Sequence, residues 1–392
     1  MRIAIVLNTS WNIFNFRHGL VKTLLEEGHQ VVAIAPEDKY SENLVEMGCE
    51  FYAVKMQNKG TNPFKDLQYA YQLYKIYKNA KVDIILQFTI KPNIYGTFAA
   101  LPLRKLVVNN VSGLGTVFLH NNLSSKIAKF LYKLSFKFPK KVFFQNEEDL
   151  QLFVEKNLIK EKTTDILPGS GVCLDKFQAQ NFERNKTFNF LMIARLLYDK
   201  GIVEYVEAAK KLKNLGLKVN FQVLGSIESE AKLGVSKEEV EIWQEKNWIE
   251  YLGTSDNVSE IIKKADCVVL PSYREGTPRS LLEACAMAKP IITTDVVGCR
   301  QTVDDGVNGF LCEVKNAEDL ADKMQKMYVL DNETLQKMGE ASRTKVEKEF
   351  DEKIVINKYL NIIKSYEILQ NRKLRKINKV KIHRAGMWWL GM

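Results

Sequence analysis

Long apolar runs are missing from this sequence. No window of about 18 residues is free of polar side chains, so we expect no transmembrane helix. The first residues, MRIAIVLNTSW, also lack the extended apolar core of a secretory signal peptide. We therefore expect a cytoplasmic protein whose first residues form a buried strand.

Cysteine pairs with the spacing of a disulfide framework or a zinc site are missing as well. The six cysteines lie at positions 49, 173, 267, 285, 299 and 312. Several stand in apolar segments, where thiols are usually buried and reduced. A GxGxxG fingerprint is also absent, which disfavours a dinucleotide site.

Positive charge is present but unevenly placed. The 392 residues carry a net charge of +10, with 22 basic and 15 acidic residues over 1–170. The stretch 171–370 is mildly acidic, with 28 basic and 32 acidic residues, and 371–392 has seven basic residues and no acidic one. A basic first half and a basic tail indicate an anionic partner.

Two series of alternating strands and helices organise the chain. Ile3–Leu7 starts the first series and Phe188–Ile193 starts the second, with an irregular Pro- and Gly-containing link between them. Such alternation is typical of parallel α/β sheets. We expect Rossmann-like domains at 1–167 and 168–351, a helix over 352–370, and a basic, aromatic tail over 371–392.

A strand, a loop and a helix in the second domain place two acidic residues together. The apolar run Cys267–Leu270 predicts a buried strand, and Thr277 and Pro278 suit the N-cap and first position of a helix. Glu275 lies in the loop and Glu283 on the helix. The carboxyl ends of parallel strands are where open α/β sheets bind ligands.

Two cations follow the first strand of the same domain. Arg195 can hold a phosphate with two hydrogen bonds and Lys200 supplies a point charge. Together with the two glutamates, which accept hydrogen bonds from hydroxyl groups, they predict a nucleotide-sugar pocket. A solvated network of ion pairs is the alternative.

Lysines recur at helical spacing over 125–141. They are Lys126, Lys129, Lys133, Lys137 and Lys140. The spacing places them on one face of a helix, and Ile127, Leu131, Leu134 and Phe138 on the opposite face. This pattern fits either an ordinary amphipathic helix or a helix on an anionic membrane surface, where each lysine contributes about 1 kcal/mol.

These motifs resemble those of family 4 retaining glycosyltransferases of the GT-B fold. The resemblance is carried by the two glutamates with seven residues between them, by Arg195 with Lys200-Gly201, and by Asp295–Gly298 and Asp305–Gly309. Gly28–Val31, Lys91-Pro92 and Ser112–Gly115 also look like the capsule and O-antigen branch, so the resemblance spans nearly the whole chain. It implies two Rossmann-like domains facing across a cleft, with the helix over 352–370 crossing back to the first domain.

The resemblance also implies roles for single residues. Arg195 and Lys200 would bind the donor diphosphate and stabilise the leaving nucleotide, where charge grows in the transition state. Glu275 would contact the donor hexose and Glu283 the ribose. The other donor-binding positions would be Gly225, Gly253, Gly276, Thr277 and Pro278.

The acceptor side departs from the family pattern. Asn8–Asn12 stands where many members have a glycine pair, and Val111–Gly115 offers no histidine. A front-face retaining mechanism needs no protein nucleophile, so this absence is tolerable. The acceptor-side residues that we expect are Ser10, Asn12, Lys91, Gly113 and Gly115.

The function expected from this resemblance is sugar transfer at a membrane surface. The closest-looking branch transfers N-acetylgalactosamine from a UDP-sugar to an undecaprenyl-diphosphate-linked glycan, on the inner face of the cell membrane. No cofactor or metal is expected, because the metal-type DxD carboxylate pair is absent.

Three alternatives stay open. The donor sugar could be another hexose for capsule or O-antigen synthesis, or the chain could be a GT-B-like UDP-sugar 2-epimerase. A basic nucleic-acid or membrane-binding module is the non-enzyme alternative. A nucleic-acid partner is not expected, because it leaves a two-domain cleft unexplained.

Overall fold

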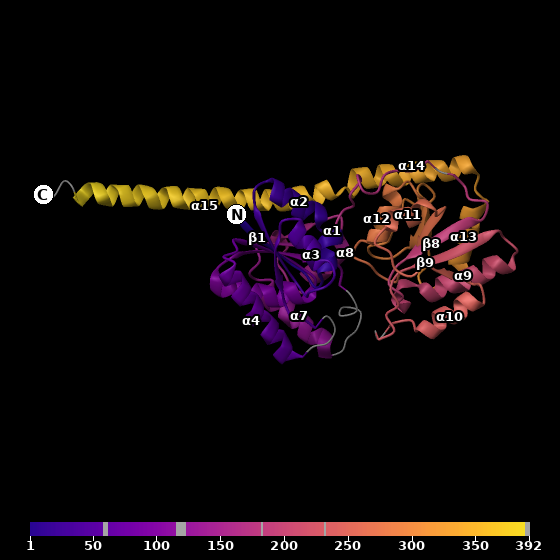
Figure 1. Cartoon of the computed structure of the whole chain (residues 1–392), viewed down its shortest axis with the longest axis horizontal. Coiled ribbons are helices and arrows are strands. Elements are labelled where there is room, and N and C mark those ends of the chain that lie inside the picture. Colours follow the sequence, from indigo (N-terminus) through magenta and orange to yellow (C-terminus); the bar gives the residue numbers. More distant parts are fainter. Residues whose placement is uncertain (58–61, 115–122, 182, 231–232, 389–392) are drawn as a thin grey trace.

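The protein consists of two α/β domains joined by a crossing helix (Figure 1). A computed structural model describes residues 1–57, 62–114, 123–181, 183–230 and 233–388, with side chains up to residue 372 except those of residues 123 and 124. Each domain is built on one sheet in which every pair of neighbouring strands is parallel.

The N-terminal sheet has seven strands in the order β3-β2-β1-β4-β5-β6-β7. Its strands are β1 (Arg2–Val6), β2 (Gln30–Ala35), β3 (Glu50–Ala53), β4 (Ile84–Phe88), β5 (Leu106–Val111), β6 (Lys141–Phe144) and β7 (Thr164–Ile166). The strands β1, β2 and β4 are nearly continuous apolar runs because both faces of the sheet are covered.

Helices cover both faces of this sheet. They are α1 (Ser10–Phe16), α2 (His18–Glu26), α3 (Ser41–Glu46), α4 (Pro63–Asn79), α5 (Thr97–Ala100), α7 (Leu123–Ser135) and α8 (Glu147–Glu155), with short turns η1 (Pro92–Gly96), η2 (Leu101–Leu103) and η3 (Glu161–Thr163). Ile3 and Ile5 pack with Val21 of α2 on one face, whereas Ala4 and Val6 pack with Leu73 of α4 on the other. This is the two-residue alternation of a strand.

The C-terminal sheet has six strands in the order β10-β9-β8-β11-β12-β13. They are β8 (Phe188–Ile193), β9 (Val219–Leu224), β10 (Glu250–Tyr251), β11 (Cys267–Leu270), β12 (Ile291–Thr294) and β13 (Gly309–Cys312). The helices around it are α9 (Ile202–Asn214), α10 (Lys237–Glu245), α11 (Val258–Lys263), α12 (Arg279–Ala286), α13 (Ala317–Val329) and α14 (Asn332–Glu349), with turns η4 (Tyr198–Lys200) and η5 (Arg300–Thr302).

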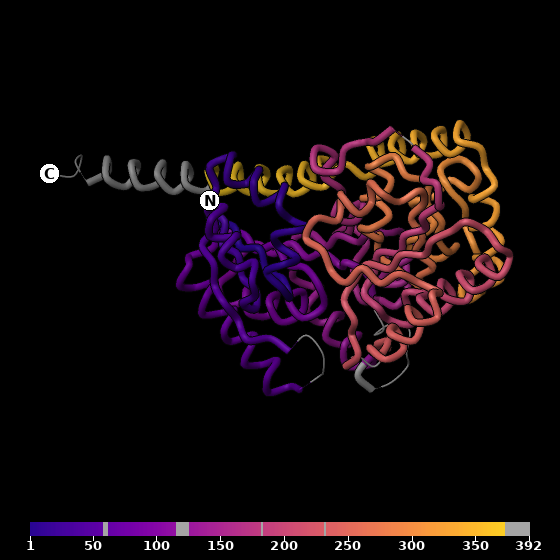
Figure 2. The backbone as a smooth tube through the Cα atoms, turned by 45° about the vertical axis from the view of Figure 1, so that its right-hand side comes forward, coloured from indigo at the N-terminus to yellow at the C-terminus, as the bar shows by residue number. Residues whose placement is uncertain are grey.

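The last helix, α15 (Glu352–Trp388), returns from the C-terminal to the N-terminal domain. Its side chains at Val355, Tyr359 and Ile363 are buried in the N-terminal core together with Ile3 and Phe88. Both views show the first part of α15 running along the N-terminal domain (Figures 1 and 2). The regularly spaced apolar side chains of α15 therefore pack against the N-terminal domain.

The carboxyl ends of the strands in the two sheets face each other. Tyr40, in the loop after β2, donates a hydrogen bond to Asp256, in the loop after β10. Asn146, after β6, donates to the carbonyl oxygen of Gly276, after β11, over 3.0 Å. Because loops that follow strands on both sides make these contacts, the ligand-binding edges of the two sheets meet at the domain interface.

Two local expectations from the sequence are wrong. Helix α12 begins at Arg279 with Pro278 as its N-cap, and the hydroxyl of Thr277 instead donates to the carbonyl oxygen of Gln145 in the other domain. Ile127 and Phe138 were expected on the face opposite the lysines, but they are 45% and 53% exposed. The residues that pack inward there are Tyr132 and Phe136, which contact Phe153 of α8.

Candidate active site

The predicted donor residues lie at the point where the strand order of the C-terminal sheet reverses. Strand β8 pairs with β9 on one side and with β11 on the other. Arg195 and Lys200 follow β8, and Glu275 follows β11. Because β8 and β11 are parallel neighbours, both loops leave the same edge of the sheet, where α/β proteins bind ligands.

Lys200 and Glu275 form an ion pair at this edge. The Lys200 Nζ lies 2.5 Å from the Glu275 Oε1, and each side chain is 17% exposed. Two further hydrogen bonds join the same loops, because the amide of Tyr273 and the hydroxyl of Ser272 both donate to the carbonyl oxygen of Asp199. The structure therefore brings two of the three predicted catalytic residues into contact.

The close approach of these loops depends on Gly201. Its φ is +75°, and a Cβ at this position would lie 2.0 Å from the carbonyl oxygen of Pro271. Glycine alone combines a left-handed backbone with the space that this contact leaves. The glycine next to Lys200 therefore holds the loop after β8 against the loop after β11.

Arg195, the third predicted catalytic residue, is exposed. Within the described part of the chain it has no ion-pair partner. A Cβ on Gly225 would lie 1.8 Å from the carbonyl oxygen of Ala194, and the amide of Gly225 donates to the carbonyl oxygen of Gly253 over 2.8 Å. These two glycines, both among the expected donor-binding positions, thus support the backbone that carries Arg195.

Glu283 is buried beside an arginine that the sequence analysis did not select. Burial raises the pKa of the Glu283 carboxyl, and the charge of Arg279 opposes that rise. The Arg279 Nε donates to the Glu283 Oε1 over 2.9 Å, and its Nη1 donates to the Ser170 hydroxyl over 3.0 Å. Contact of Glu283 with a ribose stays a prediction.

The loop that carries Glu275 is pressed against the N-terminal domain. A Cβ on Gly276 would lie 2.4 Å from the Gln145 Oε1 and 3.0 Å from the carbonyl oxygen of Ser112, and one on Gly113 would lie 3.2 Å from the Gly276 nitrogen. Gln301 also donates to the Thr277 hydroxyl over 2.6 Å. Gly113, an expected acceptor residue, is therefore adjacent to the expected donor loop.

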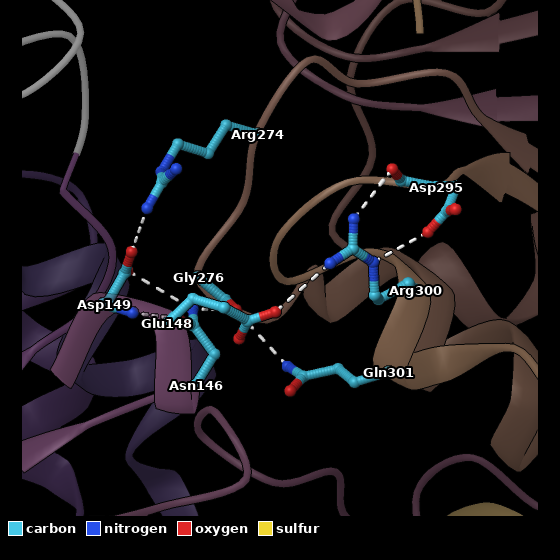
Figure 3. Close-up of polar contacts among 8 residues, drawn as sticks. All are labelled: Asn146, Glu148, Asp149, Arg274, Gly276, Asp295, Arg300 and Gln301. Carbon is cyan, nitrogen blue, oxygen red and sulfur yellow. Dashed lines mark hydrogen bonds and ion pairs between the residues drawn. The ribbon is translucent and has the colours of Figure 1, made fainter. Parts of the chain in front are cut away.

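Charged side chains join the domains around this loop (Figure 3). Arg274 pairs with Asp149 at the start of α8, and burial raises the pKa of the Asp149 carboxyl while Arg274 opposes that rise. Arg300 lies 3.3 Å from Glu148 and 2.7 Å from Asp295. We did not select these residues from the sequence. The Asn146 N-cap of α8 and its acidic first turn were the available signal.

Three of the expected acceptor residues have protein partners. Ser10 is buried, and its hydroxyl donates to the carbonyl oxygen of Pro36 over 2.9 Å. The backbone N–H of Asn12 donates to the Thr9 hydroxyl that caps α1. Lys91 forms a buried ion pair of 2.6 Å with Asp66 of α4. Their acceptor roles stay predictions, and Gly115 lies outside the described residues.

The lysines of the basic helix lie mostly at the surface. Lys126 and Lys133 are exposed on α7, Lys129 is half-buried, and Lys137 and Lys140 are exposed beyond its end at Ser135. The exposed apolar side chains of this segment are Ile127, Phe130 and Phe138. Basic and apolar groups therefore share the outer face instead of lying on opposite faces.

Comparison with known proteins decides the family. The family model described as "Glycosyl transferase 4-like" matches residues 2–146, and the model described as "Glycosyl transferases group 1" matches residues 175–345. The Campylobacter jejuni protein N,N'-diacetylbacillosaminyl-diphospho-undecaprenol alpha-1,3-N-acetylgalactosaminyltransferase is 30% identical over 382 residues, which cover 92% of this chain and 98% of the relative. The chain belongs to this glycosyltransferase family.

A further curated protein and two solved structures are also similar to this chain. An Escherichia coli UDP-Gal:alpha-D-GlcNAc-diphosphoundecaprenol alpha-1,3-galactosyltransferase is 27% identical over 302 residues, 72% of this chain and 75% of the relative. A glycosyltransferase structure from Rickettsia africae has a TM-score of 0.76 at 24% identity, over 94% of this chain and 99% of that one. Anabaena HepE in complex with UDP-glucose has a TM-score of 0.75 at 15% identity, over 93% and 100%.

These comparisons confirm the predicted GT-B fold and the predicted enzyme class. The epimerase alternative has no support among these relatives, and the non-enzyme alternative is wrong. The roles of single site residues stay predictions, because similarity of whole chains does not test them.

Proposed function

We propose that this glycosyltransferase moves N-acetylgalactosamine from a UDP-sugar to an undecaprenyl-diphosphate-linked glycan, with retention of the anomeric configuration. The observation that carries the proposal is the contact between Lys200 and Glu275 at the switch point of the C-terminal sheet, beside the exposed Arg195. The substrate class rests on the names of the Campylobacter jejuni and Escherichia coli relatives, which act on undecaprenyl-diphosphate-linked acceptors.

In the proposed reaction, two cationic side chains bind the donor diphosphate and one carboxylate binds the donor sugar. The guanidinium of Arg195 and the ammonium of Lys200 hold the donor diphosphate and stabilise the negative charge that grows on the departing nucleotide. Glu275 accepts a hydrogen bond from a hydroxyl of the donor sugar and keeps Lys200 in place. Gly276 brings the backbone of the donor loop next to Gly113, so the acceptor approaches from the N-terminal domain.

We propose that two helices of the N-terminal domain hold the enzyme at the membrane. Helices α4 and α7 both pack against η1. Phe64, Leu67 and Tyr71 of α4 follow helical spacing and are 84%, 69% and 56% exposed, and Phe130 of α7 is 60% exposed. Exposed aromatic groups beside the five lysines of the α7 region fit an anionic bilayer surface. No helix in the described ranges has the length and apolar character needed to cross a bilayer.

A donor screen tests the proposed reaction. The purified enzyme is incubated with UDP-N-acetylgalactosamine, UDP-N-acetylglucosamine, UDP-galactose or UDP-glucose and a diacetylbacillosamine-diphosphate-polyprenyl acceptor, and product mass is read. We expect the mass gain of one N-acetylhexosamine with the first donor and an alpha linkage in the product. A hexose product formed from another donor would show that the transferred sugar is not N-acetylgalactosamine. Turnover of a UDP-sugar without acceptor would contradict the proposed transfer reaction.

The same assay tests the expectation that no metal is needed. The family resemblance places the neutralising charges on Arg195 and Lys200, so removal of divalent cations with EDTA is expected to change the rate less than twofold. A loss of activity that Mg²⁺ or Mn²⁺ restores would contradict this part of the proposal.

A further inference from the structure

The N-terminal sheet has a switch point of its own. Strand β1 pairs with β2 on one side and with β4 on the other, and the chain passes through β2 and β3 before it returns to β4. Val6 lies opposite Gln87 in the register of β1 and β4. Asn8 follows β1 and Thr89 follows β4, so both residues lie at the carboxyl edge of the sheet, where such sheets bind ligands.

Both residues have buried polar atoms with nothing to bind. The Asn8 Oδ1 and the Thr89 Oγ1 have no hydrogen-bond partner among the described residues. Thr89 also has a φ of +65°, which is rare for a β-branched residue. Unsatisfied buried groups and backbone strain each cost free energy, and both are concentrated at ligand sites.

Arg17 lies near the carboxyl end of β4, the strand that Thr89 follows. It separates α1 from α2, is 5% exposed, and its guanidinium lies 4.4 Å above the ring of Phe88, the last residue of β4. Its one hydrogen bond in the described structure is a long one of 3.3 Å to the carbonyl oxygen of Phe16, and its Nε has no partner. No carboxylate of the described residues pairs with it.

A buried guanidinium without a counter-ion is costly. Burial is the main reason that the pKa of Arg17 is lowered to about 10; Tyr359 opposes this shift, and the charge of Arg279 adds to it. Arg279 belongs to α12 of the other domain and lies 5.3 Å from the ring of Phe16. Arg17 is still protonated at neutral pH, so this edge of the N-terminal sheet has excess positive charge that an anion would neutralise.

We propose that Asn8, Arg17 and Thr89 form an anion site for the diphosphate of the lipid-linked acceptor. The inference rests on the proposed function, in which the donor diphosphate occupies Arg195 and Lys200 in the other domain. An arginine fork and a threonine hydroxyl donate to phosphate oxygens, and the Asn8 oxygen accepts from a hydroxyl of the adjoining sugar. Asn8 and Thr89 are partly exposed as whole residues, so this site lies next to the surface.

Two acceptors and three variants test this site. Asn8→Asp adds a negative charge with little change in shape, Arg17→Met removes the positive charge, and Asn79→Asp adds the same charge at the exposed end of α4, beyond the other edge of the sheet. Each is assayed with the sugar on a diphosphate-polyprenyl carrier and with the same sugar on an uncharged alkyl chain. We expect Asn8→Asp and Arg17→Met to raise KM at least tenfold for the diphosphate acceptor only, with Asn79→Asp unchanged.

A binding measurement separates this site from the proposed reaction. Farnesyl diphosphate and farnesol in detergent serve as probes for calorimetry, with UDP as a probe of the donor site. We expect farnesyl diphosphate to bind more tightly than farnesol, to lose at least tenfold in affinity in Asn8→Asp, and UDP affinity to stay within twofold.

The outcomes differ for the two claims. If no UDP-sugar is transferred but Asn8→Asp still weakens farnesyl diphosphate binding, the anion site stands and the proposed reaction fails. If KM rises equally for charged and uncharged acceptors, or if Asn8→Asp weakens UDP binding instead, the acceptor-diphosphate site is overturned. Arg17→Met can fail to fold, in which case Asn8→Asp decides alone, with its melting temperature as the check.

Discussion

Lys200 and Glu275 lie 75 positions apart in the sequence and 2.5 Å apart in the structure. Their contact follows from strand order. Lys200 follows β8, Glu275 follows β11, and these two strands are parallel neighbours in the sheet. Under the proposed function, the lysine binds a phosphate of the substrate and the glutamate binds a hydroxyl. Each residue also limits the rotamers of the other, so loss of either removes charge and positioning together.

We expect Lys200→Ala and Glu275→Ala each to lower kcat/KM for sugar transfer at least tenfold, which corresponds to about 1.4 kcal/mol of transition-state stabilisation. The melting temperature of each variant is measured in parallel. Lys237→Ala on α10 is the control, because that lysine is 72% exposed and pairs with Glu241 on its own helix. If either site variant transfers sugar at a near-normal rate, the substituted residue has no role in the reaction.

The glycine beside Lys200 is a second test at the scale of one residue. Gly201→Ala is expected to destabilise the fold and reduce transfer, because its Cβ would collide with the backbone of Pro271. Gly216→Ala is the matched control, since Gly216 has a φ of +72° and nothing within 4 Å of the added atom. Both pay about 1 kcal/mol for the left-handed backbone.

The difference between the two glycine variants measures the contact itself. We expect Gly201→Ala to have the lower melting temperature and the lower kcat/KM. Equal melting temperatures of Gly201→Ala and Gly216→Ala would show that the contact between the loops after β8 and β11 does not contribute to the free energy of unfolding.

Helix α7 shows how the surroundings of an element decide the use of its faces. Its lysine spacing predicts a basic stripe, which the structure contains, but the apolar residues selected with it do not all face inward. Tyr132 and Phe136 pack on Phe153, which leaves Ile127 and Phe130 at the surface among the lysines. A surface with both basic and apolar groups is better suited to a bilayer than to water alone.

We expect the combined change of Lys126, Lys129, Lys133 and Lys137 to Glu to weaken co-sedimentation with anionic vesicles at low salt at least tenfold. Four surface lysines contribute about 1 kcal/mol each. The control changes Lys22, Lys237, Lys246 and Lys337 to Glu, which alters net charge equally at exposed positions outside the α7 region. Equal loss in both variants would show that net charge, not this helix, governs binding.

Helix α15 begins beside the other segment that connects the two domains. The amide of Glu352, where it begins, donates to the carbonyl oxygen of Val172, and the amide of Val172 donates to that of Phe350. The two chain crossings between the domains therefore lie side by side and are hydrogen-bonded to each other.

At the scale of the whole molecule, the domains meet in a closed arrangement held by charged contacts. Asp149 is 1% exposed and pairs with Arg274 in the loop that carries Glu275. Removal of one partner leaves the other buried without its counter-charge, which is more costly than removal of both. This pair therefore couples the position of the donor loop to that of α8.

We expect Asp149→Asn and Arg274→Gln each to lower kcat/KM at least fivefold, and the double variant to lose less than the product of the two effects. The double-mutant cycle is expected to give a coupling energy of about 1 kcal/mol or more. Small-angle scattering checks whether the single variants are more open than the wild type. Independent, multiplicative losses would show that the two side chains do not act as a pair.

The class of fold and the family could be predicted from the sequence, and so could the loops that meet at the carboxyl edge of the C-terminal sheet. Those conclusions depend on local regularities: apolar strands at regular intervals, loops at their carboxyl ends, and two glutamates at a set spacing. Such features are encoded by residues close in the chain, so periodicity and turn chemistry are sufficient to find them.

Which polar groups have partners depends on the folded chain and could not be predicted from the sequence. Arg17 is one of several basic residues in the first half of the sequence, and its isolation from carboxylates follows from the packing of β4, α1 and α12 around it. Lys91, one of the expected acceptor-side residues, is paired with Asp66, and this pair forms because α4 packs on η1. Desolvation and pairing depend on contacts between distant segments, and no local spacing in the sequence records them.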